Sequence, residues 1–222
     1  MIVQFTKMNL IAVSLALAAP APQQEPSATF FLGRVKFANN DGSDCRSTGR
    51  DLMTLVSQAS TLQVREEKRL ALTDPELFET PFLFMNGHND FTLSDAELDA
   101  LRTYFSHGGF LMASGCCSRP GFPDAWRREF ARIFPGAAPV RLEYSHPIYR
   151  SMHRIDRVPC AHEQRNVYLE GLTYRNHLVA VFCSDGLCCS FSMGGKCDPN
   201  RGIDESDGKK LALNIAIYAL TH

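Results

Sequence analysis

Two pairs of adjacent cysteines follow apolar runs of this chain. Cys116-Cys117 comes after residues 110–113, and Cys188-Cys189 comes shortly after residues 178–182. Short apolar runs of this kind are typical of buried parallel strands. The loops that follow such strands form the ligand-binding edge of an open α/β sheet. A cysteine placed there can act as a nucleophile, as a soft metal ligand or as half of a disulfide.

The first hypothesis for these cysteines is a binding site. Thiolates combined with imidazoles suit zinc or copper. No C-x2-C spacing is present, so the fold would have to gather the ligands from several loops. Gly87, Ser114 and Asp185 lie in the same predicted loops and are further candidate positions for binding a small ligand. The candidate metal ligands are Cys116, Cys117, Cys188, Cys189, His88 and His146.

The second hypothesis is a cysteine-dependent hydrolase or transferase. Cys116 or Cys117 would attack an acyl or related electrophile, with His88 or His146 as the base, because a nucleophilic thiol needs a neighbouring base. Cys116 with His88 is the preferred catalytic pair. The G-x-C-x-G type of turn is absent, and Pro120-Gly121 delays the helix that follows.

The N-terminus predicts export to the periplasm or beyond. Lys7 precedes an apolar run of about ten residues, a length typical of signal peptides and too short to cross a bilayer. Ala19-Pro20-Ala21 matches an A-x-A-like cleavage site. No later segment reaches the roughly 18 apolar residues that a transmembrane helix needs. We therefore expect a signal peptide at 1–21, a linker at 22–28 and a single domain at 29–222.

Export leads to a third hypothesis, an interaction domain held together by disulfides and without catalysis. All eight cysteines follow the predicted signal peptide, and disulfides persist in oxidising compartments. We expect at least one disulfide, although eight cysteines allow 105 pairings and leave the connectivity open. The formal net charge is −1, and no Lys/Arg-rich block suggests nucleic-acid binding. The small ligand or protein partner stays open.

Alternating apolar runs and amphipathic segments predict one three-layer α/β domain with a mostly parallel central sheet. Ser94 and Glu97 form the capping-box pattern of a helix start. The expected strands are 29–37, 81–85, 110–113, 140–144, 169–174 and 177–182. The expected helices are 49–60, one beginning at Ser94, 123–134 and 209–220, and residues 190–207 are expected to form a long loop.

Four blocks in order, residues 81–114, 126–136, 145–149 and 211–222, resemble the bacterial family called domain of unknown function 4159. The resemblance covers about residues 30–222 and implies a flavodoxin-like fold of the class I glutamine-amidotransferase-like group. The activity of that family is not established.

Two family features have counterparts in this chain. Members commonly carry a Gly-His, here Gly87-His88, and a His-Pro-Ile/Leu block, here His146-Pro147-Ile148. Many members place acidic residues after the strand that matches residues 110–113, where this chain has Ser114-Gly115-Cys116-Cys117. The resemblance therefore puts an acid-based role for this loop in doubt and leaves room for a cysteine role.

Overall fold

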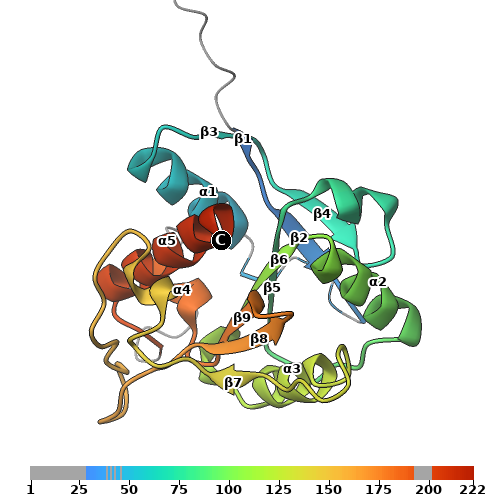
Figure 1. The fold of residues 1–222 in the computed structure, drawn as a ribbon. Coiled ribbons are helices and arrows are strands. Elements are labelled where there is room, and N and C mark those ends of the chain that lie inside the picture. The colour runs from blue at the N-terminus through green and yellow to red at the C-terminus, as the bar shows by residue number, and fades with distance from the viewer. Residues whose placement is uncertain (1–28, 39, 41, 43, 46, 193–201) are drawn as a thin grey trace, which may run out of the picture.

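The structure, a computed structural model, describes residues 29–222 except 39, 41, 43, 46 and 193–201. Its centre is a seven-stranded sheet with the order β4-β2-β5-β6-β9-β8-β7 (Figure 1). The first five strands in this order run parallel, whereas β8 and β7 are added antiparallel. The strands are β2 (Gly33–Lys36), β4 (Lys68–Ala71), β5 (Phe82–Gly87), β6 (Phe110–Gly115), β7 (Val140–Arg141), β8 (Glu170–Tyr174) and β9 (His177–Cys183).

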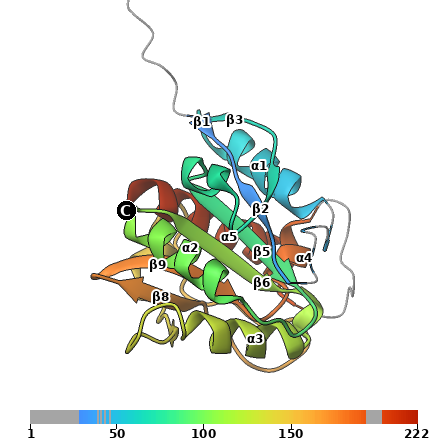
Figure 2. The ribbon, with the colours of Figure 1, turned by 90° about the vertical axis from the view of Figure 1, so that its right-hand side faces the viewer.

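Helices cover both faces of this sheet (Figures 1 and 2). Their bounds are α1 (Thr48–Ala59), α2 (Asp95–Ser106), α3 (Gly121–Phe130), α4 (Leu187–Phe191) and α5 (Glu205–Thr221). Three short 3-10 turns are η1 (Pro75–Glu79), η2 (Cys116–Ser118) and η3 (Pro147–Arg150), and a separate parallel pair joins β1 (Thr29–Phe30) to β3 (Gln63–Val64). The predicted α/β class with a mostly parallel, flavodoxin-like sheet is confirmed.

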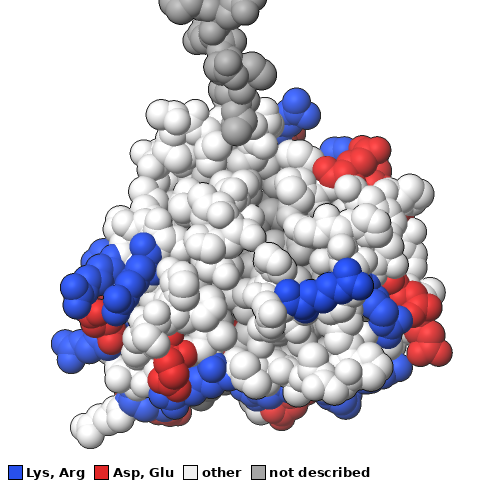
Figure 3. Space-filling model, in the orientation of Figure 1, with Lys and Arg blue, Asp and Glu red and all other residues white. Residues whose placement is uncertain are grey.

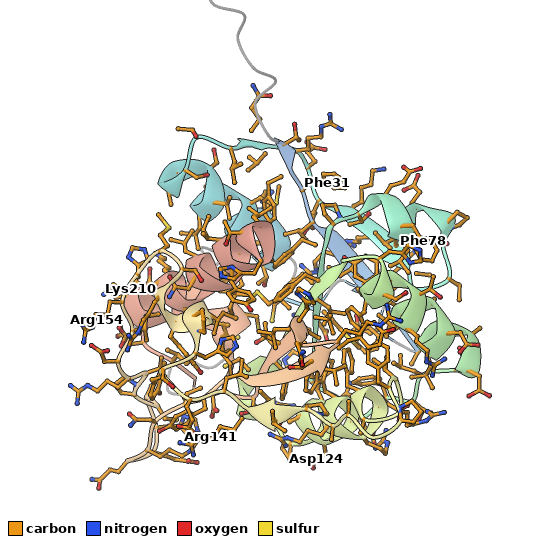
Figure 4. The ribbon with its side chains drawn as sticks, viewed as in Figure 1. Phe31, Phe78, Asp124, Arg141, Arg154 and Lys210 are labelled. Carbon is orange, nitrogen blue, oxygen red and sulfur yellow. The ribbon has the colours of Figure 1, made fainter. Side chains whose placement is uncertain are left out.

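Alternate side chains of the central strands enter two different cores. Phe84 of β5 and Met112 of β6 pack in the core shared with α1 and α5. Their neighbours Leu83 and Leu111 pack in the core shared with α2 and α3. Because both faces of each strand are buried, the strands read in sequence as continuous apolar runs. Figure 4 shows these cores filled by side chains, with the labelled Phe78 at the periphery.

The start of α2 follows the predicted capping box. The Ser94 hydroxyl accepts a hydrogen bond from the Glu97 backbone N–H at 3.3 Å, and the Ser94 N–H donates to the Glu97 carboxylate at 2.8 Å. These bonds satisfy two of the donors that a helix start leaves without intrahelical partners. The predicted boundary is therefore correct to the residue.

The region predicted as a long loop, residues 190–207, overlaps a helix at each of its ends. α4 occupies Leu187–Phe191, and α5 begins at Glu205 rather than at 209. Asp204 caps α5, accepting a hydrogen bond from the Ser206 N–H at 2.9 Å. The first turn of α5 is polar, and for this reason the apolar pattern did not predict it as helix. Gly208 in this turn packs closely on Ser190, because a Cβ at Gly208 would lie 1.9 Å from the Ser190 hydroxyl oxygen. Residues 193–201 lie outside the described part of the chain.

Three other boundaries differ from the prediction. The strand expected at 29–37 is divided into β1 and β2, and the strand expected at 140–144 is reduced to two residues at the antiparallel edge of the sheet. α3 covers Gly121–Phe130 instead of 123–134. The predicted signal peptide and the whole predicted linker, residues 22–28, lie outside the described residues. Within the described part, no helix is both long enough and apolar enough to cross a membrane, and the face in Figure 3 carries basic and acidic side chains close together.

Candidate metal centre

Three cysteines from three separate loops meet at the carboxyl edge of the sheet. Cys45 lies between β2 and α1, Cys116 directly follows β6, and Cys188 lies in α4 just after β9. The Cys116 Sγ lies 3.4 Å from the Cys45 Sγ and 3.4 Å from the Cys188 Sγ. All three Sγ atoms lie within 4.8 Å of one another. Cys116 and Cys188 are fully buried, whereas Cys45 is partly exposed.

Hydrogen bonds between the end of β6 and the start of α4 hold Cys188 next to Cys116. Gly186 adopts left-handed backbone angles at the N-cap of α4, and its N–H donates to the Gly115 carbonyl at 3.0 Å. The N–H of Cys188 donates to the hydroxyl of Ser114 at 3.0 Å. Ser114, predicted as a ligand-binding residue, is fully buried and holds the first turn of α4 against β6.

A tight turn before α1 presents Cys45. This residue has a φ of 50°, a left-handed conformation that costs energy for a residue with a side chain. The backbone N–H and the hydroxyl of Thr48 both donate to the Cys45 carbonyl, at 2.9 and 2.6 Å. These two bonds hold the strained turn, so the Cys45 side chain is directed toward the other two thiols.

The buried side chains of Asn86 and Arg34 form a second layer of contacts around the thiols. The Asn86 Nδ2 donates to the Cys116 Sγ at 3.1 Å, while its Oδ1 accepts from the Arg34 guanidinium at 2.9 Å. Arg34 is fully buried and lies over the Phe84 ring, 5.2 Å from its centroid. Burial lowers the pKa of Arg34, and the nearby Glu67 partly opposes that shift. A buried cation favours negative charge nearby.

The pKa values of the three thiols are raised together. Contact with Cys116 and burial raise the pKa of Cys188 well above its ordinary value. The contact with Cys188 acts to lower the pKa of Cys116, but the contact with Cys45 and burial outweigh it. The pKa of Cys45 is also raised, because its contacts with Cys188 and Cys189 outweigh the effect of Cys116. These pKa shifts favour the protonated thiols over the thiolates.

The second cysteine of each pair behaves differently from the first. The Cys189 Sγ lies 3.9 Å from the Cys188 Sγ and borders the group. The Cys117 Sγ instead contacts the His88 Nε2 at 3.6 Å. The His88 Nδ1 lies 3.4 Å from the Asp44 carboxylate, and hydrogen bonding to His88 lowers the pKa of Asp44. We preferred Cys116 as the partner of His88 and named Cys117 as the alternative, and the structure places Cys117 there.

The structure places His146 away from the thiols, although we expected its loop at the same sheet edge. Its ring contacts Tyr218, which in turn contacts Phe110 at the beginning of β6, whereas Cys116 follows the end of that strand. The His146 Nδ1 accepts the N–H of Ile148 at 3.2 Å and caps η3.

The other predicted ligand-binding positions stay at the carboxyl edge. Asp185 pairs with Arg165 and accepts the Ser184 hydroxyl at 2.8 Å. Gly87 ends β5, where a Cβ would lie 2.6 Å from the Phe122 ring.

A smaller group lies around Cys160. The Cys160 Sγ is 3.3 Å from the His162 Nδ1, and the Glu163 carboxylate is 3.6 Å from the His162 Nε2. These three side chains form the second cluster of potential metal ligands among the described residues. Glu163 also pairs with Arg165, which neutralises its charge and makes this cluster the weaker candidate.

Sequence reasoning missed Cys45 and Asp44 as site residues, and also Asn86 and Arg34. The available signal was positional, because Asp44-Cys45 follows a strand and a turn cluster, as the paired cysteines do. The predicted disulfides are not confirmed. No disulfide joins two cysteines within the described part of the chain, and Cys197 lies outside it.

Comparisons with known proteins identify a family and a distant structural likeness. The model of a family described as "Domain of unknown function (DUF4159)" matches residues 32–220. No curated protein matches the chain. One similar solved structure is that of a ThuA-like protein from Bacteroides uniformis ATCC 8492, with 10% identity and a TM-score of 0.43 over 92% of this chain and 96% of that chain.

Proposed function

The chain belongs to the DUF4159 family, and we propose that it binds one soft metal ion, zinc or copper(I), through Cys45, Cys116 and Cys188. The convergence of three Sγ atoms within 4.8 Å, from loops after three different strands, carries the proposal. Thiolates are the preferred ligands of both ions. Cys189 borders the group and is the candidate fourth ligand.

The sulfur spacing suits such an ion after a small adjustment. A tetrahedral zinc site with Zn–S bonds of about 2.3 Å places its sulfurs roughly 3.8 Å apart. The two shortest separations here are 3.4 Å, and Cys188 and Cys189 are 3.9 Å apart. Shifts of a few tenths of an ångström therefore bring these separations to the spacing of such a site.

The charges near the site favour zinc. With Cys45, Cys116 and Cys188 as thiolates and Cys189 as a neutral thiol, a Zn²⁺ centre carries a net charge of −1, which the buried guanidinium of Arg34, 3.7 Å from Glu67, partly offsets. The same thiolates around Cu⁺ carry −2, a larger negative charge in the same buried place and therefore a more costly one. The hydrogen bond from Asn86 to the Cys116 Sγ is typical of the outer contacts that orient metal ligands.

The burial of the ligands points to a structural ion. Cys116 and Cys188 have no exposed surface, and closed thiolate sites are typical of structural zinc, whereas catalytic zinc keeps an open position. The ion would join the loops after β2, β6 and β9. It would thereby fix the edge of the sheet at which α/β proteins bind their ligands.

Disulfide formation is the competing chemistry of the same atoms. To form a disulfide, the Sγ atoms of Cys45 and Cys116 would have to approach from 3.4 Å to about 2.05 Å.

We further propose that the chain is exported after cleavage at Ala21 into an oxidising compartment, which would act on unprotected thiols. A bound metal would keep them reduced. N-terminal sequencing of the periplasmic protein tests the export, with Pro22 as the expected first residue.

The decisive experiment measures metal content and thiols on the same purified protein. We expect about one zinc or copper per chain, and loss of that metal in Cys116→Ser and Cys188→Ser. Cys183→Ala is the matched control, because Cys183 is equally buried at the end of β9 and belongs to neither ligand cluster. If the purified protein holds no metal and its free-thiol count is lower by an even number, the cysteines form disulfides and the metal proposal is wrong. If it holds no metal and all its thiols react, both the metal site and the disulfides are refuted.

A further inference from the structure

A second arrangement of chemical groups lies next to the thiol cluster and shares none of its ligands. Cys117, His88 and Asp44 form a chain of contacts, with 3.6 Å from the Cys117 Sγ to the His88 Nε2 and 3.4 Å from the His88 Nδ1 to the Asp44 Oδ2. A thiol, an imidazole and a carboxylate in this order are the components of a nucleophile, its base and the group that orients the base.

The backbone at Cys117 sets it apart from its neighbours. Cys117 has φ 55° and ψ 24° within the turn between β6 and α3. A left-handed conformation costs energy in a residue other than glycine, and such residues cluster at functional sites. Nucleophiles of several α/β enzymes occupy strained strand-to-helix turns, which lift the reactive atom out of the sheet. The same twist directs adjacent cysteines to different sides, Cys116 to the thiols and Cys117 to His88.

Asp44 is firmly held in its place opposite His88. Its carboxylate accepts a hydrogen bond from the Asn40 amide at 2.9 Å. Its backbone carbonyl accepts from the Arg34 guanidinium at 2.7 Å and from the Asn86 amide at 3.0 Å. The imidazole therefore meets a fixed acceptor at Nδ1, which leaves Nε2 directed at the thiol.

Exposure decreases in steps from the carboxylate to the thiol. The side chains of Asp44 and His88 are 34% and 23% exposed, whereas Cys117 is 7% exposed. The Phe122 ring lies close to Gly87, immediately before His88. Because Phe122 is itself fully buried and Cys117 nearly so, the surroundings of the sulfur leave little space, which favours a small acyl group over a bulky one.

We propose that Cys117 is an acyl-transfer nucleophile with His88 as its base and Asp44 as the positioning residue, acting on esters or thioesters of small acyl groups. His88 takes the thiol proton while the sulfur forms a bond to the carbonyl carbon. The bond from carbon to the leaving group then breaks, and His88 returns the proton to that group. Water next attacks the thioester with His88 as base, which releases the carboxylic acid and restores the thiol.

The test uses p-nitrophenyl acetate as the probe on the full protein. We expect a burst of up to one p-nitrophenolate per chain and one added acetyl group, mapped by mass spectrometry to Cys117. The octanoate ester should react at least tenfold more slowly than the acetate. Cys160→Ser is the control that should keep the burst, because Cys160 is buried to the same 7% and contacts a different histidine.

Variants distinguish chemistry from folding. His88→Ala should slow acetylation at least 100-fold, a factor typical of a lost general base, and added imidazole should restore part of the rate. Asp44→Asn should slow it about tenfold, with partial recovery in Asp44→Glu. No acetylation, acetylation at another cysteine, or a native rate in His88→Ala would each overturn the proposal. Failure of this proposal and failure of the metal proposal are distinguishable, because acetylation is mapped to Cys117, which is not one of the three proposed metal ligands, whereas metal content is measured separately.

Discussion

The buried guanidinium of Arg34 provides the sharpest test of the proposed metal centre. We predict that Arg34→Gln weakens zinc binding about 30-fold without changing the ligands. The side chain reaches the thiols through Asn86, which accepts from Arg34 at 2.9 Å and donates to the Cys116 Sγ at 3.1 Å. The two hydrogen bonds and the amide between them place the donating nitrogen of the cation at most about 8 Å from the sulfur, by addition of ordinary bond lengths.

The magnitude follows from Coulomb's law. At about 8 Å and an effective dielectric constant of about 20, one pair of unit charges interacts by about 2 kcal/mol. Removal of the cation should therefore cost the zinc–thiolate centre about 2 kcal/mol, or about 30-fold in affinity. Salt should screen this effect weakly, because Arg34 is fully buried.

The assay is a zinc titration against a chromophoric chelator of known affinity, on protein whose fold is checked by circular dichroism. Arg69→Gln is the matched control, because Arg69 pairs with Arg34 in the register of β2 and β4 but is exposed to solvent. We expect the control to change the affinity less than threefold. Equal affinities for the native protein and a folded Arg34→Gln would refute the electrostatic reasoning.

Three further predictions concern pH and stability. Because the thiol pKa values are raised, zinc must displace three protons at neutral pH. Its apparent affinity should therefore rise by up to about 10³-fold per pH unit, and a slope near zero between pH 6 and 8 would contradict this. Asn214→Leu should lower the free energy of unfolding by about 3 kcal/mol, measured in urea, because the buried amide bonds the Met152 N–H at 3.1 Å and both the N–H and the carbonyl of His153 at 2.7 and 2.8 Å. Burial and His222 lower the pKa of His146, so the unfolded state binds the proton more readily and stability falls as pH drops below about 6.5. His146→Asn should lose less stability between pH 7.5 and 5.5 than the native protein, and an equal loss would assign the acid sensitivity elsewhere.

Local patterns in the sequence were enough for most of the fold. Continuous apolar runs predicted β5, β6 and β9, because strands buried on both faces need apolar residues at every position. The Ser94–Glu97 pair located the start of α2 for a local reason, since a capping box involves only four residues. Helix α4 was missed because its five residues, Leu187–Phe191, are too few to show a helical period.

The composition of the candidate site was less predictable. Cys116, Cys188 and His88 could be placed at one sheet edge, because parallel strands end on the same side. Nothing local selected Cys45, which meets Cys116 across 71 positions of the chain. His146 belongs to a His-Pro-Ile block that resembles the family pattern. Its ring nevertheless packs on Tyr218 of α5, which contacts Phe110 at the start of β6, at the opposite end of that strand from Cys116.

The sequence by itself determined the α/β class, the strand ends that carry cysteine, and the residue types available for soft-metal or thiol chemistry. Only the tertiary structure decided which cysteines meet. Hydrophobic periodicity fixes where a strand runs, whereas the direction of a side chain in the following turn depends on backbone angles such as the left-handed φ of Cys117. Those angles are held by contacts between distant loops, and for this reason Cys116 joins the thiols while its neighbour Cys117 faces His88.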